Sequence, residues 1–389
     1  MQDAAIARND FYTGPADTRL AVTRLRLTDF RSYRRAEYDG DARPVVLTGP
    51  NGAGKTNMLE AVSFLAPGRG LRQARLSEID RRADGVVGWG VAATVSGASG
   101  PVDLGTGREQ DQQRRTVRLN GVPASGQSTL AEYVSVVWLT PQMDRLFLDG
   151  ASARRRFLDR LVFGFDTAHA GRVGSYEHAM RERLRLLKAG GADNVWLSAL
   201  EETMAERGVA IAAARQDMAH RLARACAEGT GPFPRAGIAA TGDVETWLDN
   251  GPALAAEDRL REQLAQSRRT DAESGRTAVG PHRSDFSVWH LEKDMPADQC
   301  STGEQKALLI AVVLADARLQ AAERGAAPLL LLDEVVAHLD AEKRQALFAE
   351  ILSLGAQAWL TGTDRETFAE LESSVQFFRV ANAALERTS

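Results

Sequence analysis

The sequence contains little cysteine and no long apolar run, and these absences exclude several classes of protein. Cys226 and Cys300 are its only cysteines, so it has neither a disulfide framework nor the spacing of a metal site, as is typical of a reducing cytoplasm. The longest uninterrupted apolar stretch, residues 307–315, is less than half as long as a membrane helix, so we predict a buried helix there and no membrane span. Residues 1–18 lack the apolar segment of a secretory signal and are predicted to form a disordered tail.

Neither sign of charge is in large excess, and aromatic residues make up only 6% of the chain. The 48 Lys and Arg residues against 52 Asp and Glu give a net charge of -4, so any nucleic-acid contact requires a local concentration of cations. Residues 151–190 form such a segment, with nine Lys or Arg and four Asp or Glu. Because few aromatic residues lie among these cations, any contact with DNA is expected to involve the phosphate backbone of a duplex or junction rather than base stacking. The alternative is that these arginines only form a solvated helix face.

The length of 389 residues and the hydrophobic content of 44% predict a large core and two lobes. Alternating or apolar runs predict strands at 24–28, 45–47, 134–139, 285–291 and 329–332, and several antiparallel strands within 85–125. From residue 151 the chain is rich in Arg, Ala, Leu and Glu, which predicts helices. The apolar residues that recur there at helical intervals are Leu200, Met204, Ile211, Met218 and Leu222.

From these patterns we predict an α/β fold that consists of a head with a helical insertion lobe. The head is expected to be discontinuous, with residues 19–150 and 272–389 folding together around one parallel sheet. Residues 151–271 are expected to form the helical insertion lobe, which protrudes between the two parts of the head.

The clearest functional motif is Gly-x-x-x-x-Gly-Lys-Thr at residues 49–56, between a predicted strand and a predicted helix. In this arrangement backbone N–H groups and the positive end of the helix dipole face the phosphates of a nucleotide. Lys55 is expected to bridge the β- and γ-phosphates and to assist catalysis, and the Thr56 hydroxyl is expected to bind Mg²⁺. The predicted ATP-binding residues are Gly49, Pro50, Asn51, Gly52, Ala53, Gly54, Lys55, Thr56 and Asn57.

An acidic pair completes the predicted catalytic site. The four leucines at 329–332 predict a buried strand that ends at Asp333 and Glu334. We expect Asp333 to lie beside the metal, through a water molecule, and Glu334 to act as general base on the attacking water.

A Ser-Thr-Gly-Glu turn at residues 301–304 precedes a predicted helix. Alone it is a capping box, which needs no nucleotide. Together with the phosphate loop and the acidic pair, it resembles the signature turn of ABC-type ATPases, in which the Ser-Gly turn of one subunit completes the site of another. The resemblance implies that Ser301, Thr302, Gly303 and Glu304 grip the γ-phosphate in trans, and both roles can coexist.

The same resemblance assigns roles to further positions. Gln142 stands where this class has a glutamine that senses Mg²⁺ and the γ-phosphate, and a plain polar loop residue is the alternative. Asp340 stands at the place of a carboxylate that contacts the dimer partner. Many ABC transporters carry a histidine where this sequence has Thr361-Gly362-Thr363-Asp364, and Thr363 or Asp364 could replace it.

Over nearly its whole length the chain resembles the RecF family, bacterial recombinational-repair ATPases related to SMC proteins. The segments that carry the resemblance, besides the nucleotide motifs, are 25–33, 139–141, 154–159 and 280–285. The resemblance implies that the predicted α/β head is an ABC-type P-loop ATPase head, similar to those of SMC and RecF proteins. It also implies a cytoplasmic protein that binds ATP and Mg²⁺, hydrolyses ATP weakly in a DNA-dependent reaction, and dimerises on ATP.

The resemblance also implies partners in DNA replication and repair. They are gapped, duplex or single-stranded DNA, a second copy of the chain, and the recombination mediator proteins that help to load recombinase at gaps. The arginines that we predict to contact DNA are Arg31, Arg34, Arg35, Arg69, Arg72, Arg154, Arg155 and Arg156.

Other functions share the nucleotide motifs. The nucleotide-binding subunit of an ABC transporter has the same loop, turn and acidic strand, but here about 245 residues separate Thr56 from Ser301. An SMC-like chromosome-organising protein needs a coiled coil much longer than residues 151–267 can make. A P-loop kinase or GTPase would leave residues 301–305 without a role.

Overall fold

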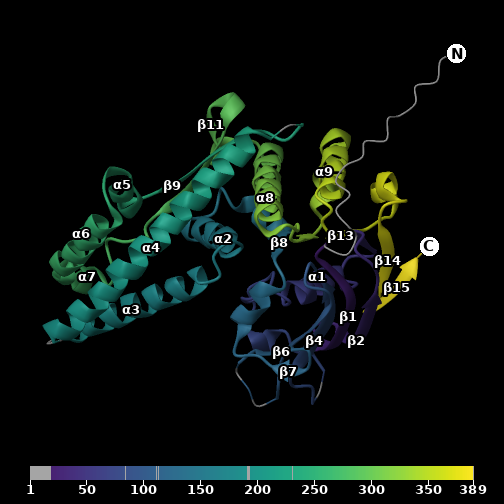
Figure 1. Ribbon diagram of the computed structural model, residues 1–389, viewed down its shortest axis with the longest axis horizontal. Helices are drawn as coiled ribbons and strands as arrows, with labels where there is room; N and C mark the ends of the chain where they lie inside the picture. Colours follow the sequence, from purple (N-terminus) through teal and green to yellow (C-terminus); the bar gives the residue numbers. More distant parts are fainter. Residues whose placement is uncertain are drawn as a thin grey trace. The chain divides into compact units, whose positions relative to one another are not determined.

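The residues that the computed structural model describes are 19–83, 85–110, 112, 114–190, 193–229 and 231–388. The tail predicted at 1–18 lies outside them. The chain divides into two compact units (Figure 1). The first unit comprises the chain up to Pro141 together with Gln320–Ser389, and the second comprises Gln142–Leu319. Both boundaries differ from those predicted at 150 and 271.

Six strands form a mostly parallel sheet in the first unit, in the order β15-β14-β3-β13-β12-β8. All neighbouring strands are parallel except β14 and β15. The strands are β3 Val45–Thr48, β8 Val136–Leu139, β12 Leu329–Leu332, β13 Ala358–Gly362, β14 Gln376–Ala381 and β15 Ala384–Thr388. The leucines of β12 are all buried, as expected for an interior strand of a parallel sheet. The carboxyl ends of β3, β13, β12 and β8 share one edge of this sheet.

The second sheet of the first unit is antiparallel, in the order β2-β1-β4-β5-β6-β7. Its strands are β1 Ala21–Phe30, β2 Tyr33–Asp39, β4 Trp89–Ser96, β5 Val102–Arg108, β6 Thr116–Leu119 and β7 Val122–Pro123. The hairpins predicted within 85–125 are therefore confirmed. Asn120 and Gly121 have φ values of 49° and 81° and form the two-residue turn between β6 and β7, which requires a left-handed backbone.

Two buried glutamines fasten the antiparallel sheet to the parallel one. The side chain of Gln357 accepts the N–H of Val22 at 2.9 Å and donates to the carbonyl of Val22 at 3.0 Å. Gln376 on β14 accepts the N–H of Asp41 at 3.1 Å and donates to the carbonyl of Arg43 at 3.0 Å, both in the connection from β2 to β3, and it also donates to the hydroxyl of Tyr38 on β2 at 3.4 Å. Because a buried amide is stable only when its donors and acceptors are paired, these two side chains fix the position of the sheet edge.

The second unit is mainly helical. Its helices are α2 Ala151–Phe163, α3 His169–Ala189, α4 Asn194–Ala227, α5 Asp243–Asn250, α6 Ala253–Gln266, α7 Arg268–Ser274 and most of α8 Thr302–Arg324. In Figure 1, α3 and α4 run side by side. The helical periodicity predicted along α4 is confirmed, since Met204, Ile211, Met218 and Leu222 are all buried.

A small antiparallel sheet explains why the second unit is longer than predicted. β10 Asp285–His290 pairs with β9 Ala236–Thr241 along its whole length and with β11 Met295–Pro296 at its end. The strand predicted at 285–291 is therefore present, but its assignment to the parallel sheet is wrong. The segment after residue 271 packs on the insertion because its strand completes a sheet that β9 begins.

Helix α8 contains the apolar stretch 307–315, whose residues are all buried, and the prediction of a core helix there is confirmed. In the part of the chain that the structure describes, no helix is long and apolar enough to span a bilayer.

Candidate nucleotide site

The phosphate loop lies between β3 and α1 (Lys55–Ser63), as predicted. Gly49 has φ 146°, and a Cβ there would lie 2.2 Å from the carbonyl oxygen of Val380 on β14. Gly54 has φ 118° and precedes α1, and the Tyr33 hydroxyl donates to its carbonyl at 3.1 Å. Since only glycine adopts these conformations so close to other atoms, the neighbouring strands fix the curl of the loop.

Lys55 is turned onto the loop that it follows. Its ammonium group donates to the carbonyls of Gly49 at 2.7 Å and Pro50 at 3.1 Å, and the side chain is only 4% exposed. An ammonium has three donors, so one donor is left beside these two bonds. This donor and the N-terminus of α1 together form a cationic site for the phosphates of a nucleotide.

Thr56 and Asp333 lie together, although 277 residues separate them in the sequence. The Thr56 hydroxyl is 3.0 Å from the Asp333 carboxylate, which follows the carboxyl end of β12. Burial raises the pKa of the Asp333 carboxyl, and hydrogen bonds from Thr361 and Thr56 oppose this rise. Among the described residues no cluster of three or more His, Cys, Asp or Glu could hold a metal. A hydroxyl and one carboxylate nevertheless fit Mg²⁺, which takes its remaining ligands from water and phosphate.

Thr361, at the end of β13, connects the two acidic residues. Its hydroxyl donates to Asp333 at 2.9 Å and accepts the backbone N–H of Glu334 at 2.8 Å. Glu334 has φ 53°, an unusual conformation for a non-glycine residue, and this hydrogen bond helps to hold it. Thr363 and Asp364, which could replace the histidine of ABC transporters, are both exposed and bond to each other, and that role stays a prediction. Thr361 is therefore the residue of this segment that reaches the acidic pair.

We expect Thr361→Val to lower the ATPase rate by about 10- to 100-fold. The substitution leaves the Glu334 N–H without its partner and removes one of the two threonine hydroxyls that donate to the Asp333 carboxylate, a loss of about 1–3 kcal/mol. The concentration of Mg²⁺ needed for half-maximal rate should rise, whereas nucleotide affinity in the absence of Mg²⁺ should stay the same. Thr361→Ser keeps the hydroxyl and should restore most of the rate. A valine variant with the rate and Mg²⁺ dependence of the wild type would show that the hydroxyl does not position the pair.

The predicted signature turn lies at the start of α8 in the second unit. Ser301 and Glu304 form the capping box: the Ser301 N–H and hydroxyl donate to the Glu304 carboxylate at 2.9 and 2.8 Å. The ammonium of Lys293 also bonds Glu304, and these donors lower the pKa of Glu304 to about 2. The prediction of a capping box is confirmed. Ser301, Thr302 and Gly303 are exposed, so the turn is accessible from solvent.

Two further predicted positions are exposed. Gln142 follows the end of β8 by three residues and is the first residue of the second unit. Asp340 caps the N-terminus of α9 (Ala341–Ser353), where its carboxylate accepts the Lys343 N–H at 2.8 Å and pairs with the Lys343 ammonium at 2.5 Å. The roles of these residues toward a nucleotide or a second copy stay predictions.

Comparison with known proteins decides the family. The family model described as RecF/RecN/SMC N terminal domain matches residues 21–386. The DNA replication and repair protein RecF of Rhizobium rhizogenes is 48% identical to this chain over 371 residues, which cover 94% of this chain and 98% of that protein. The chain belongs to the RecF family. Identity of this extent favours that family over a transporter subunit or an SMC-like protein.

Solved structures show that the chain has the fold of this family. A structure of the recombination mediator protein RecF-ATPrS in the RecFOR pathway matches 96% of this chain and 99% of that one, with a TM-score of 0.84 at 20% identity. An Smc head domain with ScpA derived from Pyrococcus furiosus matches less well, with a TM-score of 0.52 at 14% identity over 95% and 96% of the two chains. The predicted fold, an ABC-type head related to SMC proteins, is confirmed.

Near the phosphate loop of this RecF-family chain, two of the arginines that we predict to contact DNA pair with a buried carboxylate. Glu60 on α1 is fully buried, and it accepts from Arg31 at 2.6 and 2.8 Å and from Arg72 at 2.8 Å. Arg72 also donates to the Asn57 side chain at 2.7 Å, and Asn57 donates to Ser32 at 2.9 Å. Arg31, Arg72 and Asn57 therefore brace the phosphate-loop helix.

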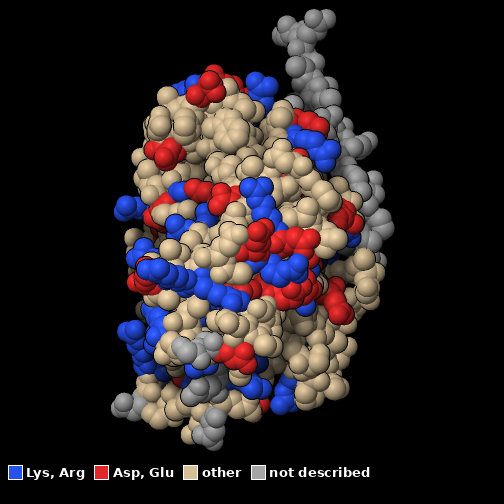
Figure 2. Space-filling view, turned by 90° about the vertical axis from the view of Figure 1, so that its left-hand side faces the viewer, with Lys and Arg blue, Asp and Glu red and all other residues tan. Residues whose placement is uncertain are grey.

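In the second unit, arginines of the segment 154–159 bind residues of the segment 280–285; both segments carry the family resemblance. Arg154 pairs with both oxygens of Asp285, at 2.8 and 2.7 Å, and Arg155 donates to the carbonyl of Ser284 at 2.6 Å. Arg156 is exposed and bonds Ser152 at 2.6 Å. Basic and acidic side chains intermingle on the face shown in Figure 2. Arg154 and Arg155 are thus engaged within the fold, whereas Arg156 lies on the surface.

The remaining predicted DNA contacts are exposed arginines of the first unit. Arg35 is 78% exposed and pairs with Glu37 at 2.6 Å. Arg34 and Arg69 are exposed, and no carboxylate of the described residues pairs with either. The sequence alone could not distinguish these exposed arginines from Arg31, Arg72 and Arg154, because the carboxylates that pair with the latter are distant in the chain.

Proposed function

We propose that this chain is an ATP-dependent DNA-binding protein of recombinational DNA repair and replication. ATP and Mg²⁺ close a homodimer, and weak, DNA-dependent hydrolysis opens it. The proposed place of action is gapped DNA in the cytoplasm, together with the recombination mediator proteins that help to load recombinase. The relatives support this proposal, since the similar protein of Rhizobium rhizogenes is a DNA replication and repair protein.

The exposed turn at the start of α8 is the observation that carries the proposal of a dimer. A Cβ added at Gly303 would meet no described atom within 4 Å, and Gly303 is not among the residues with positive φ. Packing and backbone conformation in its own unit therefore do not require glycine there. A glycine without a local reason fits a surface on which a phosphate of a nucleotide bound by a second copy approaches the backbone.

The residues of the phosphate loop supply the other half of the proposed site. The free donor of Lys55 and the N–H groups at the start of α1 hold the phosphates. Thr56 and Asp333 would hold Mg²⁺, which neutralises charge on the phosphates when it is bound. Glu334 takes the proton of the attacking water, and Thr361 fixes the backbone of Glu334 for this step.

The experiment that tests the proposal is sedimentation of the full chain with Mg²⁺-ATP. The wild type should dimerise transiently, and Glu334→Gln should accumulate as a stable dimer because removal of the base slows hydrolysis by about 100-fold or more. Glu342→Gln, which makes the same change of charge at an exposed position of α9, should behave as the wild type. In mobility shifts with gapped, duplex and single-stranded DNA, ATP should increase binding. Persistent monomers and no ATP-dependent shift would contradict the proposal.

A further inference from the structure

A pocket of about 760 Å³ lies in the first unit beside the loop that follows α1. The residues of its lining that bear hydrogen-bonding side chains are Arg69, Arg75, Ser77, Arg108 and Gln127. Three of these five are arginines. The pocket is separate from the phosphate loop, since it shares no lining residue with 49–56.

The pocket presents donors and few free acceptors. Arg69 and Arg75 are exposed, and no described carboxylate forms an ion pair with their guanidinium groups. The side-chain oxygen of Gln127 accepts the Gly68 N–H at 3.1 Å and Arg115 at 3.2 Å, so its amide NH₂ is the part that remains for a ligand. Arg108 pairs with Asp80, and Glu78 accepts the Arg75 N–H at 3.0 Å on an exposed side. Among the described residues, no carboxylate therefore neutralises the guanidinium groups of Arg69 and Arg75.

A buried cation lies directly behind the wall of this pocket. Arg115 is 7% exposed and donates to the carbonyls of Phe64, Ala66 and Gly68 and to the Thr106 hydroxyl. All of its acceptors are neutral. Burial lowers the pKa of Arg115 to about 9, so the group is still charged at neutral pH. Since no carboxylate of the described residues pairs with this charge, it adds to the positive potential of the pocket.

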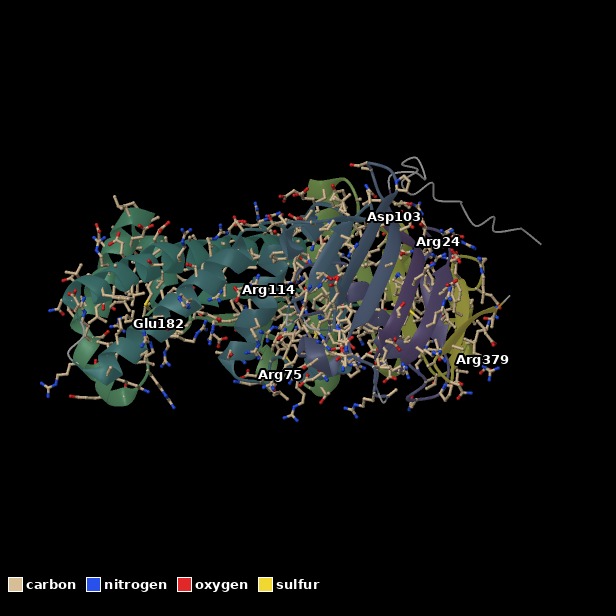
Figure 3. The ribbon with its side chains drawn as sticks, turned by 90° about the horizontal axis from the view of Figure 1, so that it is seen from below. Arg24, Arg75, Asp103, Arg114, Glu182 and Arg379 are labelled. Carbon is tan, nitrogen blue, oxygen red and sulfur yellow. The ribbon has the colours of Figure 1, made fainter. Side chains whose placement is uncertain are left out.

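The surroundings of Arg75 contrast with the other end of the antiparallel sheet. In Figure 3, Arg24 and Asp103 lie at the end of that sheet opposite to Arg75. There Arg24 pairs with Asp39 at 3.0 Å, and Arg118 on the same sheet pairs with Glu109 at 3.7 Å. Arg24 and Arg118 are thus neutralised by carboxylates, whereas no carboxylate of the described residues pairs with Arg69 or Arg75, which face an external anion.

We propose that this pocket binds a phosphate group of the DNA backbone. The inference rests on the proposed function, which supplies a polyanion as ligand. Arginine presents a planar fork of donors that matches phosphate oxygens, and such contacts position a protein on DNA without reading its sequence. A free phosphate ion has the same chemistry, so the test must separate the two sources.

The test compares two double variants of the full chain. Arg69→Ala with Arg75→Ala removes the two unpaired guanidinium groups of the pocket, and Arg24→Ala with Arg118→Ala removes two exposed, paired ones from the same unit. Binding to a duplex with a gap is measured at several salt concentrations in the presence of ATP. The pocket variant should bind about 10- to 100-fold more weakly, and its slope of log affinity against log salt should fall by about 1.8. Both variants should keep the thermal unfolding curve of the wild type.

Each outcome decides the question. Equal affinity and salt slope in the two double variants would overturn the pocket assignment while leaving the proposed function intact. A wild-type chain that binds no DNA would overturn both. In a third measurement, inorganic phosphate is added alone and the unfolding temperature is compared between the wild type and the pocket variant. If phosphate raises the unfolding temperature of the wild type only, and both proteins bind DNA equally well, the pocket binds the free ion. The assignment to DNA is then wrong.

Discussion

A chain carrying Lys55→Met is expected to lose measurable ATP binding and to stay monomeric in Mg²⁺-ATP. The ammonium of Lys55 is the buried cation of the phosphate loop, and it holds the Gly49 and Pro50 carbonyls at 2.7 and 3.1 Å. Methionine removes the charge that faces the phosphates and leaves both carbonyls without this donor. Loss of a charge-assisted contact of about 3 kcal/mol or more lowers affinity by at least about 100-fold. Calorimetric titration with ATP and sedimentation measure the two effects.

The matched control for this variant is Lys188→Met, which makes the same change at an exposed position of α3 and should bind ATP as the wild type does. Wild-type affinity in Lys55→Met would remove Lys55 from the site. Retained affinity without dimerisation would instead assign Lys55 to closure alone.

Mixing two inactive variants tests whether the site is shared between copies. Ser301→Arg blocks the exposed turn of the second unit, and it should bind ATP but not dimerise with itself. In a mixed dimer with Lys55→Met, one composite site carries both defects and the other carries none. Equimolar mixing should therefore recover part of the wild-type ATPase rate. If each chain closed its own site, no mixture would recover activity.

The nucleotide motifs could be predicted from the sequence because each lies in one contiguous segment. The phosphate loop requires glycine at fixed spacing between a strand and a helix, and four leucines mark the strand that ends at Asp333. Thr361 could not be found in this way. Its contact with Asp333 depends on the strand order β3-β13-β12, which places the end of β13 between the phosphate loop and the acidic pair. Strand order is a property of the assembled sheet, and no local pattern records it.

The arginines show a second limit. Counting charge over 151–190 favours a surface for DNA, but Arg154 has its partner Asp285 at a separation of 131 residues. Arg31 likewise pairs with Glu60, 29 residues away. A cation with a distant carboxylate looks unpaired in the sequence, so local charge counts overestimate the positive surface. A distant partner also explains why the segment after residue 271 is predicted in the wrong unit. Its strand β10 pairs with β9, and helices α5, α6 and α7 lie between the two strands in the sequence.

Arg183→Met is expected to destabilise the second unit by about 3–5 kcal/mol, the cost of leaving a buried charge without its partner. Arg183 on α3 is fully buried and donates to Glu201 at 2.9 Å, Asp271 at 2.7 Å and the carbonyl of Leu264 at 2.6 Å. Arg268 also pairs with Glu201, so two cations neutralise two buried carboxylates. This cluster joins α3, α4, α6 and α7. Methionine fills the space but leaves Asp271 without its cation.

Hydrogen exchange of the full chain measures this effect locally, because loss of the cluster should speed exchange in α3 and α4 and leave the amides of β3, β12 and β13 protected. Arg185→Met is the control, because Arg185 lies two residues after Arg183 on the same helix, is 65% exposed and pairs with Glu182. Its loss should change the free energy of unfolding by less than about 1 kcal/mol. Adding Asp271→Asn to Arg183→Met should recover part of the loss, since it removes the unpaired charge. If Arg183→Met and Arg185→Met exchanged alike, the buried cluster would not hold the helices together.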